Sequence, residues 1–120
     1  MHGKVKSSPN RFHVNLQQGS PYQTIALHFN PRYREGGTPH GQTLVVLNSL
    51  VGSWGAENRP VTSAMRPGNH FVLSIRRQPH HYDLMVDGFL LTQYPHRITA
   101  DIVDTVEIEG DVKIKSVIVM

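Results

Sequence analysis

Three polar side chains that form directed hydrogen bonds, those of His28, Asn30 and Arg32, alternate along one short segment of the chain. Successive side chains of a β-strand point to opposite faces, so these three would emerge together while Leu27 and Phe29 face the other way. A row of hydrogen-bonding groups backed by an apolar row is typical of a binding surface that lies over a hydrophobic core.

The same alternation returns downstream, at Asn48 and at Glu57 with Arg59, and the single tryptophan, Trp54, lies between them. Arginine forks, a carboxylate and an amide can hydrogen-bond to hydroxyl groups, while an indole ring can cover a patch of C–H groups. A sugar ring presents both kinds of surface. The combination therefore favours a carbohydrate-binding site in which Glu57 bridges Arg32 and Arg59. At about 1 kcal/mol per hydrogen bond, such a shallow site would bind a disaccharide at roughly mM to µM.

The elements that would position these residues are short strands. Runs that alternate apolar and polar residues are separated by Gly, Pro, Asn and Asp, and no segment has a sustained helical period. The predicted strands are 11–16, 24–30, 43–48, 58–61, 69–76, 81–86, 89–94 and 113–119, with a weaker one at 102–106. Their spacing predicts an all-β sandwich or barrel. Asp87-Gly88 predicts a tight hairpin turn, and the apolar character of both faces near the end of the last strand predicts a central or covered position for it.

Length and composition limit the classes of protein that remain. The 120 residues predict one domain, residues 1–120, and the absence of cysteine excludes disulfides and cysteine-based zinc sites. The net charge of +3 comes from scattered basic residues, which does not favour nucleic acid as a partner. No apolar run reaches transmembrane length and no secretory signal is evident, so we expect a soluble protein made in the cytosol, without membrane insertion.

Two classes of enzyme, a metal-dependent enzyme and a glycosidase, fit the residues poorly. The eight histidines include no His-x-x-x-His pair, so we expect no metal site and no cofactor. Glu57 with Asp83 or Asp87 could be considered as a pair of glycosidase carboxylates. However, Arg59 lies two residues from Glu57 on the same face, which favours a permanently ionised carboxylate over a general acid. We therefore expect a non-catalytic protein.

At this level of detail the chain resembles a known family. Residues 28–32 (His-Phe-Asn-Pro-Arg), 45–48 (Val-Val-Leu-Asn) and 54–59 (Trp-Gly-Ala-Glu-Asn-Arg) are similar to the signature of the galectin carbohydrate-recognition domain, and residues 11–16, 82–88, 94–98 and 109–112 extend the similarity over nearly the whole chain. The resemblance implies an antiparallel two-sheet β-sandwich of the jelly-roll type. It also implies a lectin for β-galactosides such as lactose or N-acetyllactosamine, on glycoproteins or glycolipids.

The resemblance implies a role for each candidate residue. His28, Asn30 and Arg32 would surround the axial hydroxyl of galactose. Trp54 would stack beneath the ring, with Asn48 and Glu57 at the primary hydroxyl. Arg32, Glu57 and Arg59 would then reach the neighbouring sugar.

Three departures from the family pattern add further expectations. The loop 33–43 is long, and it either places Arg34, Glu35 or His40 beside an extended glycan or forms a solvated turn. The stretch 49–53 is a residue shorter than usual. The N-terminal edge strand, which often pairs at a dimer interface, is expected to be shortened or absent, which leaves the oligomeric state or a tandem-domain partner open.

The alternative to a lectin is a galectin-like domain whose partner is a protein and whose sugar binding is weak or lost. For either function the resemblance implies a cytoplasmic protein, or one exported without a signal peptide.

Overall fold

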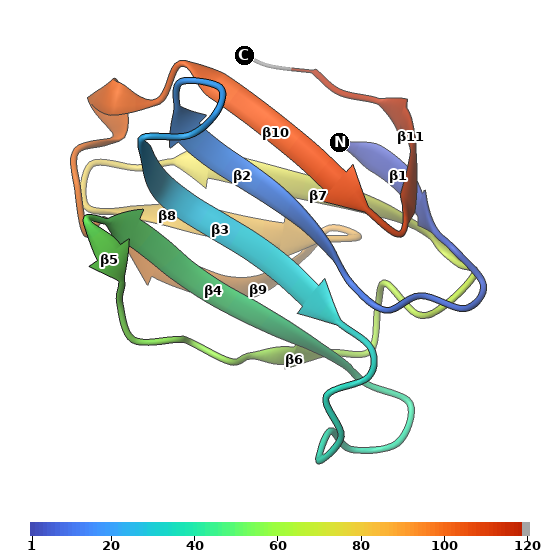
Figure 1. The fold of residues 1–120 in the computed structure, drawn as a ribbon. Coiled ribbons are helices and arrows are strands. Elements are labelled where there is room, and N and C mark those ends of the chain that lie inside the picture. The colour runs from blue at the N-terminus through green and yellow to red at the C-terminus, as the bar shows by residue number, and fades with distance from the viewer. Residues whose placement is uncertain (119–120) are drawn as a thin grey trace.

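Two antiparallel β-sheets pack face to face in the computed structural model, which describes residues 1–118 (Figure 1). The first sheet has the strand order β11-β1-β7-β8-β9 and consists of β1 (His2–Val5), β7 (His70–Arg77), β8 (His81–Val86), β9 (Phe89–Pro95) and β11 (Val112–Ser116). The second sheet has the order β10-β2-β3-β4-β5 and consists of β2 (Phe12–Gln18), β3 (Thr24–Arg32), β4 (Thr43–Val51), β5 (Ser53–Trp54) and β10 (Thr105–Gly110), with β6 (Val61–Thr62) paired to the start of β4. One 3₁₀ turn, η1 (Ala100–Ile102), precedes β10. The prediction of an all-β sandwich is confirmed.

The core lies between the sheets, and strands such as β1 and β8 bury alternate side chains against it. In β3, Leu27 and Phe29 are fully buried, whereas His28 and Arg32 on the opposite face remain partly open to solvent. The β7–β9 sheet contributes Phe71 and Tyr94 to the same core. Burial of one face fixes the register of a strand, since a shift of one residue would expose its apolar set. The inner packing therefore determines which side chains the outer face of β3 presents.

Several predicted strands agree closely with the structure. Strand β8 has the predicted bounds, and the Asp87-Gly88 hairpin is confirmed, with φ values of 51° and 84°. Strand β3 continues two residues beyond the predicted end, to Arg32, and therefore includes the whole polar row.

Other predicted strands differ. The predicted strand at 58–61 is wrong, because only an isolated bridge forms at Asn58, before the two-residue β6. Pro60 follows this bridge and has no N–H to donate to a ladder. The weak strand at 102–106 begins later, at Thr105, and runs to Gly110.

Strands from the two ends of the chain, β1 and β11, pair with each other in the first sheet. Residues His2–Val5 form β1, an interior strand between β11 and β7. The covered position predicted for the last strand is wrong: β11 is an edge strand of its sheet and ends at Ser116, while residue 119 lies outside the described residues. Strand β10 pairs with β2 alone among the strands of residues 1–118, so its outer edge carries no neighbour there. No helix in this part of the chain has the length and hydropathy needed to cross a membrane.

Candidate carbohydrate-binding site

The centre of the candidate site is a row of polar residues across three neighbouring strands. His28 on β3 lies opposite Asn15 on β2 and opposite Asn48 on β4. The Nδ1 atom of His28 is 2.6 Å from the Asn15 Oδ1, which can only accept, so Nδ1 carries the proton and Nε2 is left as an acceptor. Burial and the neighbouring His13 lower the pKa of His28 from 6.5 to about 4. The imidazole is therefore neutral at physiological pH.

Asn30 and Arg32 continue this row along β3 and fix each other. The Asn30 side chain is buried and donates from Nδ2 to the carbonyl oxygen of Phe12 at 2.7 Å. Its Oδ1 accepts from Nε of Arg32 at 2.9 Å. The amide orientation is thus determined by partners at both ends, and the guanidinium is held in the plane of the row.

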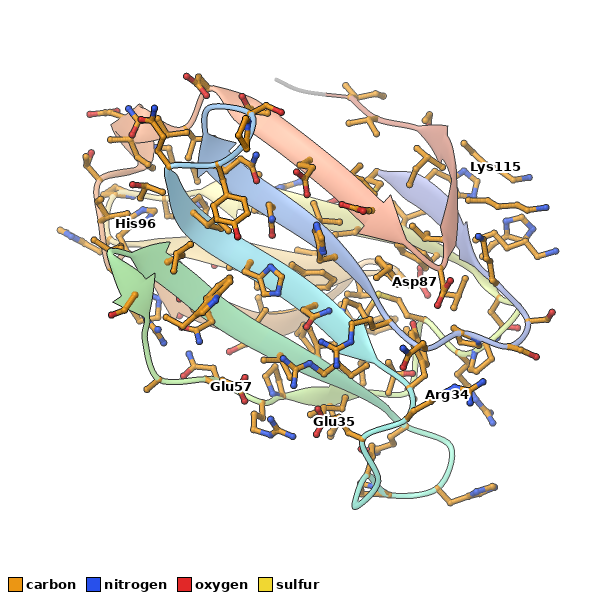
Figure 2. The ribbon with its side chains drawn as sticks, in the orientation of Figure 1. Arg34, Glu35, Glu57, Asp87, His96 and Lys115 are labelled. Atoms are coloured by element: carbon orange, nitrogen blue, oxygen red, sulfur yellow. The ribbon has the colours of Figure 1, made fainter. Side chains whose placement is uncertain are left out.

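Arg32 belongs to a closed ring of alternating charges at the open end of β3 and β4. Its Nη1 and Nη2 atoms lie 2.7 Å from Glu35 and 3.4 Å from Glu57. Arg59 pairs with the same two carboxylates, at 3.3 Å from Glu35 and 2.6 Å from Glu57. Figure 2 shows Glu35 and Glu57 arriving from two separate segments, the loop after β3 and the stretch after β5. Glu57 bridges Arg32 and Arg59 as predicted, and Glu35 forms a second bridge between the same two arginines.

The ring also determines the charge state of its members. Hydrogen bonds from Arg32 and Arg59 lower the pKa of Glu35. Its carboxylate therefore stays ionised over a wider pH range than a free glutamate, and the two arginines keep their partner.

Trp54 forms the floor of the site beside His28. It ends β5, pairs with Leu50 on β4, and leaves 48% of its surface exposed. The centres of the Trp54 and His28 rings are 4.9 Å apart. A tryptophan in a core would be buried, so this half-exposed ring is available to cover an apolar face of a ligand.

Asn48 is held by a contact from outside the sheet. Its Oδ1 accepts from Nη1 of Arg97 at 2.9 Å, and its Nδ2 donates to the carbonyl oxygen of Gly55 at 2.8 Å. A Cβ atom at position 55 would lie 2.9 Å from Arg97 Nη1, so a side chain there would displace the guanidinium group from Asn48. Arg97 also lies over the Tyr94 ring, 5.0 Å from its centre. Arg97 therefore lies close to both Asn48 and Gly55, the residue that follows Trp54.

These groups line one open pocket of about 510 Å³. Its lining consists of Arg11, His28, Asn30, Arg32, Val46, Asn48, Trp54, Gly55 and Glu57. Six of the seven residues predicted for the site are thus brought together. Arg59, the seventh, stands behind Glu57 in the ion-pair ring.

The two residues predicted for an extended subsite lie elsewhere. Arg34 is exposed, and its Nε is 3.4 Å from the carbonyl oxygen of Pro9; with Arg11 and Glu35 it lines an adjoining pocket of about 290 Å³. His40 is exposed and lines another pocket, which the long loop forms together with Arg32, Arg66 and Pro67. The pocket beside Arg34 shares Arg11 and Arg32 with the main pocket, whereas the pocket beside His40 shares Arg32 alone.

Asn15, Gly55 and Arg97 were not predicted as site residues, and neither were Arg11 and Val46 of the pocket lining. Glu35 was expected only beside an extended glycan, and not in an ion-pair ring. Asn15 shares the outward parity of His13 on the neighbouring strand, a signal that the sequence contains. Arg97 is 49 residues from Asn48 along the chain, and the local sequence pattern does not predict their contact.

Metal-ligating groups gather at one point of the described residues. Donor atoms of His13, Glu107 and Glu109 lie within 4.8 Å of one another on β2 and β10. The Nε2 atom of His13 is already hydrogen-bonded to Glu107 at 2.7 Å, and Glu109 is exposed to solvent. We assign no metal to this group.

Comparisons with known proteins agree with this geometry. The family model described as galactoside-binding lectin matches residues 1–119. Human galectin-4 is 39% identical over 118 residues, and the aligned region covers 96% of this chain and 34% of that protein. Rabbit galectin-3 is 30% identical, with coverage of 95% and 45%. The chain thus spans less than half the length of these relatives.

Solved structures show the same fold. The galectin LEC-6 of Caenorhabditis elegans superposes with a TM-score of 0.78 at 28% identity, covering 93% of this chain and 73% of that one. Sheep galectin-11, solved in complex with glycerol, gives a TM-score of 0.81 at 26% identity, with coverage of 96% and 82%. The chain belongs to the galectin family of galactoside-binding lectins, whose members are non-catalytic.

Proposed function

We propose that this chain is a lectin domain that binds β-galactosides of the lactose or N-acetyllactosamine type. The observation that carries the proposal is the half-exposed Trp54 ring beside a row of fixed polar groups in one pocket. In this proposal Trp54 covers the apolar face of galactose. His28, Asn30 and Arg32 surround the axial hydroxyl, and Asn48 with Glu57 binds the primary hydroxyl.

Preorganisation supports this assignment. Arg32 has three side-chain acceptors in the protein, and both ends of the Asn30 and Asn48 amides are occupied before a ligand arrives. Little side-chain entropy is then lost on binding, which favours affinity. The site is shallow and each hydrogen bond replaces one to water, so we expect a dissociation constant of roughly mM to µM.

A longer glycan would extend toward the ion-pair ring. In this proposal Arg59 and Glu57 contact the second sugar, and Arg34 lines the adjoining pocket. His40 is the weaker candidate because its pocket shares only Arg32 with the main pocket. We further propose that residues 1–120 act as one recognition domain for glycans of glycoproteins or glycolipids, in the cytoplasm or after export without a signal peptide.

Retention on immobilised lactose tests the proposal against the protein-interaction alternative. The wild-type chain should be retained, eluted by free lactose and not eluted by sucrose, while Trp54→Leu should pass through. Passage of the folded wild-type chain would favour a domain whose partner is a protein. Circular dichroism of each variant separates loss of binding from loss of fold.

A further inference from the structure

All four lysines of the chain lie close to one edge of the sandwich, on β1, on β11 and just after β1. Two of them, Lys4 and Lys113, are direct neighbours in the β1–β11 pairing. Lys4 also lies opposite His70 on β7, and His2 lies on the same exposed face of β1 as Lys4. We call His2, Lys4, His70, Lys113 and Lys115 the basic strip.

The basic strip faces solvent because the alternate residues face the core. In β1 the exposed His2 and Lys4 alternate with buried Gly3 and Val5. In β7 the exposed His70 precedes the buried Phe71. The His2 and His70 rings lie 5.8 Å apart, so the strip is continuous from β1 to β7.

Acidic groups do not neutralise this strip. Within residues 1–118 no lysine nitrogen lies within 4 Å of a carboxylate oxygen. Partial desolvation and the charges of Lys115, Lys4 and His2 lower the pKa of His70. The nearby Asp87 is held at the β8 end by the backbone N–H of Val72. Lys6 faces Asp111 and is left out of the strip for that reason.

We propose that the basic strip is a second binding surface, which takes sulfated polysaccharide chains. Several like charges held side by side on a rigid sheet cost stability unless a polyanion covers them. A polymer with closely spaced sulfate groups supplies matching charge along the strip, and such a chain is narrow enough to follow three strands.

The surroundings of the strip favour a narrow polymer over a flat anionic bilayer. Phe89 and Leu90 are exposed at the β8–β9 turn, and apolar side chains of this kind could enter a membrane interface. However, Asp87 occupies the same turn, and Asp83 projects from the same face of β8 between buried Tyr82 and Leu84. A bilayer that covered the face would approach both carboxylates. The strip also contains no Trp, Tyr or Phe on which nucleic acid bases could stack.

The strip and the candidate galactoside site lie on different sheets. His28 and Trp54 belong to the β10-β2-β3-β4-β5 sheet, whereas the strip lies on the outer face of the other sheet. Lys115 and Glu57 are accordingly far apart in Figure 2. Both ligands can therefore be bound at once, and the domain would link a galactoside-bearing molecule to a sulfated chain.

Calorimetric titration of the whole chain with a heparin dodecasaccharide tests the proposal. We expect saturable binding that weakens as salt is raised and that saturating lactose leaves unchanged. Lys4→Gln with Lys115→Gln should lower the affinity by about tenfold. The matched control, Arg76→Gln with Arg77→Gln, removes the same charge from the far end of β7 and should change it by about twofold or less.

Three outcomes would overturn the proposal. Equal losses for the lysine and arginine variants would mean that net charge alone attracts heparin. Displacement of heparin by lactose would place it in the galactoside pocket. Tighter, lysine-dependent binding to phosphatidylserine vesicles or to a short DNA duplex than to heparin would assign the strip to a different partner. Because the lactose titration is independent, failure here leaves the proposed lectin function standing.

Discussion

At the scale of single residues, hydrogen bonds within the protein fix the orientation of the polar groups of the site. His28 donates to Asn15 through Nδ1, and Arg32 holds Asn30 through Nε. The remaining atoms, such as Nε2 of His28, have roles determined in advance, because the tautomer and the amide orientation are set by the inner partner. Selectivity for one sugar stereoisomer depends on such fixed donor and acceptor positions.

The first prediction concerns pH. Because burial and His13 lower the pKa of His28 to about 4, His28 stays a neutral acceptor from pH 8 to pH 5. Galactoside affinity should then be flat over this range and fall only as pH approaches 4. This replaces the midpoint near 6.5 that an unperturbed histidine would give. Lactose titrations at several pH values check it, and a midpoint near 6.5 would contradict it.

The same pKa shift has a consequence for stability. The unfolded chain takes up a proton on His28 below pH 6.5, whereas the folded chain does so only near pH 4. The free energy of unfolding should therefore decrease as pH falls from 6.5 to 4. Urea denaturation at each pH measures this, and it also shows where the binding data still report on folded protein. A His28→Gln variant should lose part of that slope.

The next prediction separates charge from shape at Arg32. In Arg32→Lys the charge remains, but one ammonium cannot reach Asn30, Glu35 and Glu57 together. Lactose affinity should fall by about tenfold, the size expected from the loss of one to two hydrogen bonds. The matched control is Arg34→Lys, since Arg34 points to Pro9. Similar lactose affinities for the two variants would argue against a binding role for the forked guanidinium group of Arg32.

At the scale of elements, the segment from Trp54 to Arg59 owes its position to β4. Backbone N–H groups of Leu47 and Asn58 donate to each other's carbonyl oxygens at 2.8 and 2.9 Å, and Val45 donates to Pro60 at 2.9 Å. Two short strands and one bridge thus hold the indole and the Glu57–Arg59 pair along the sheet edge. Arg97 supports this edge from the loop before η1.

Arg97 is therefore predicted to position Asn48 without contacting the sugar. In Arg97→Met the hydrogen bond to Asn48 Oδ1 is lost, while the backbone N–H of Ser49 still occupies that oxygen. We expect lactose affinity to fall by about fivefold with little loss of stability. Arg77→Met, which breaks an exposed pair with Asp101, serves as control and should change neither quantity measurably. Unchanged lactose affinity in Arg97→Met would remove Arg97 from the site.

The elements also show what a sequence can predict. Alternation was sufficient for β3 and β8, and turn chemistry was sufficient for Asp87-Gly88, because these signals are local. The pairing of β1, the edge position of β11 and the contact of Arg97 with Asn48 depend on residues far apart in sequence. The ion pair of Glu35 is also a long-range feature. In the sequence the loop 33–43 has the composition of a solvated turn, and only the folded structure shows that Glu35 pairs with Arg59.

At the scale of the whole molecule, the two sheets are joined by a buried polar contact beneath the site. Ser49 on β4 donates through Oγ to the carbonyl oxygen of Ala26 at 2.7 Å, and its Oγ lies 2.6 Å from the Tyr94 hydroxyl on β9. A serine hydroxyl has a single proton, so Tyr94 must be the donor in this pair. The contact ties the sheet that carries the site to the sheet behind it.

Removing the Tyr94 hydroxyl and removing the Ser49 hydroxyl should cost different amounts of stability. Tyr94→Phe removes the donor but leaves Ser49 bonded to Ala26, at a cost of about 1 kcal/mol. Ser49→Ala leaves the buried Tyr94 hydroxyl without an acceptor, at a cost of about 1–3 kcal/mol. Urea denaturation should therefore rank Ser49→Ala as the less stable variant. The reverse ranking would mean that the proton of Ser49 points to Tyr94.

The central claim is that Trp54 and the polar row form one galactoside site, and the single tryptophan allows a direct test. Lactose should change Trp54 fluorescence in a saturable way, by quenching or a blue shift, with a dissociation constant of roughly mM to µM. Sucrose, which contains no galactose, should leave the emission unchanged. An emission spectrum of the folded chain that does not respond to lactose at concentrations well above this range would contradict the account.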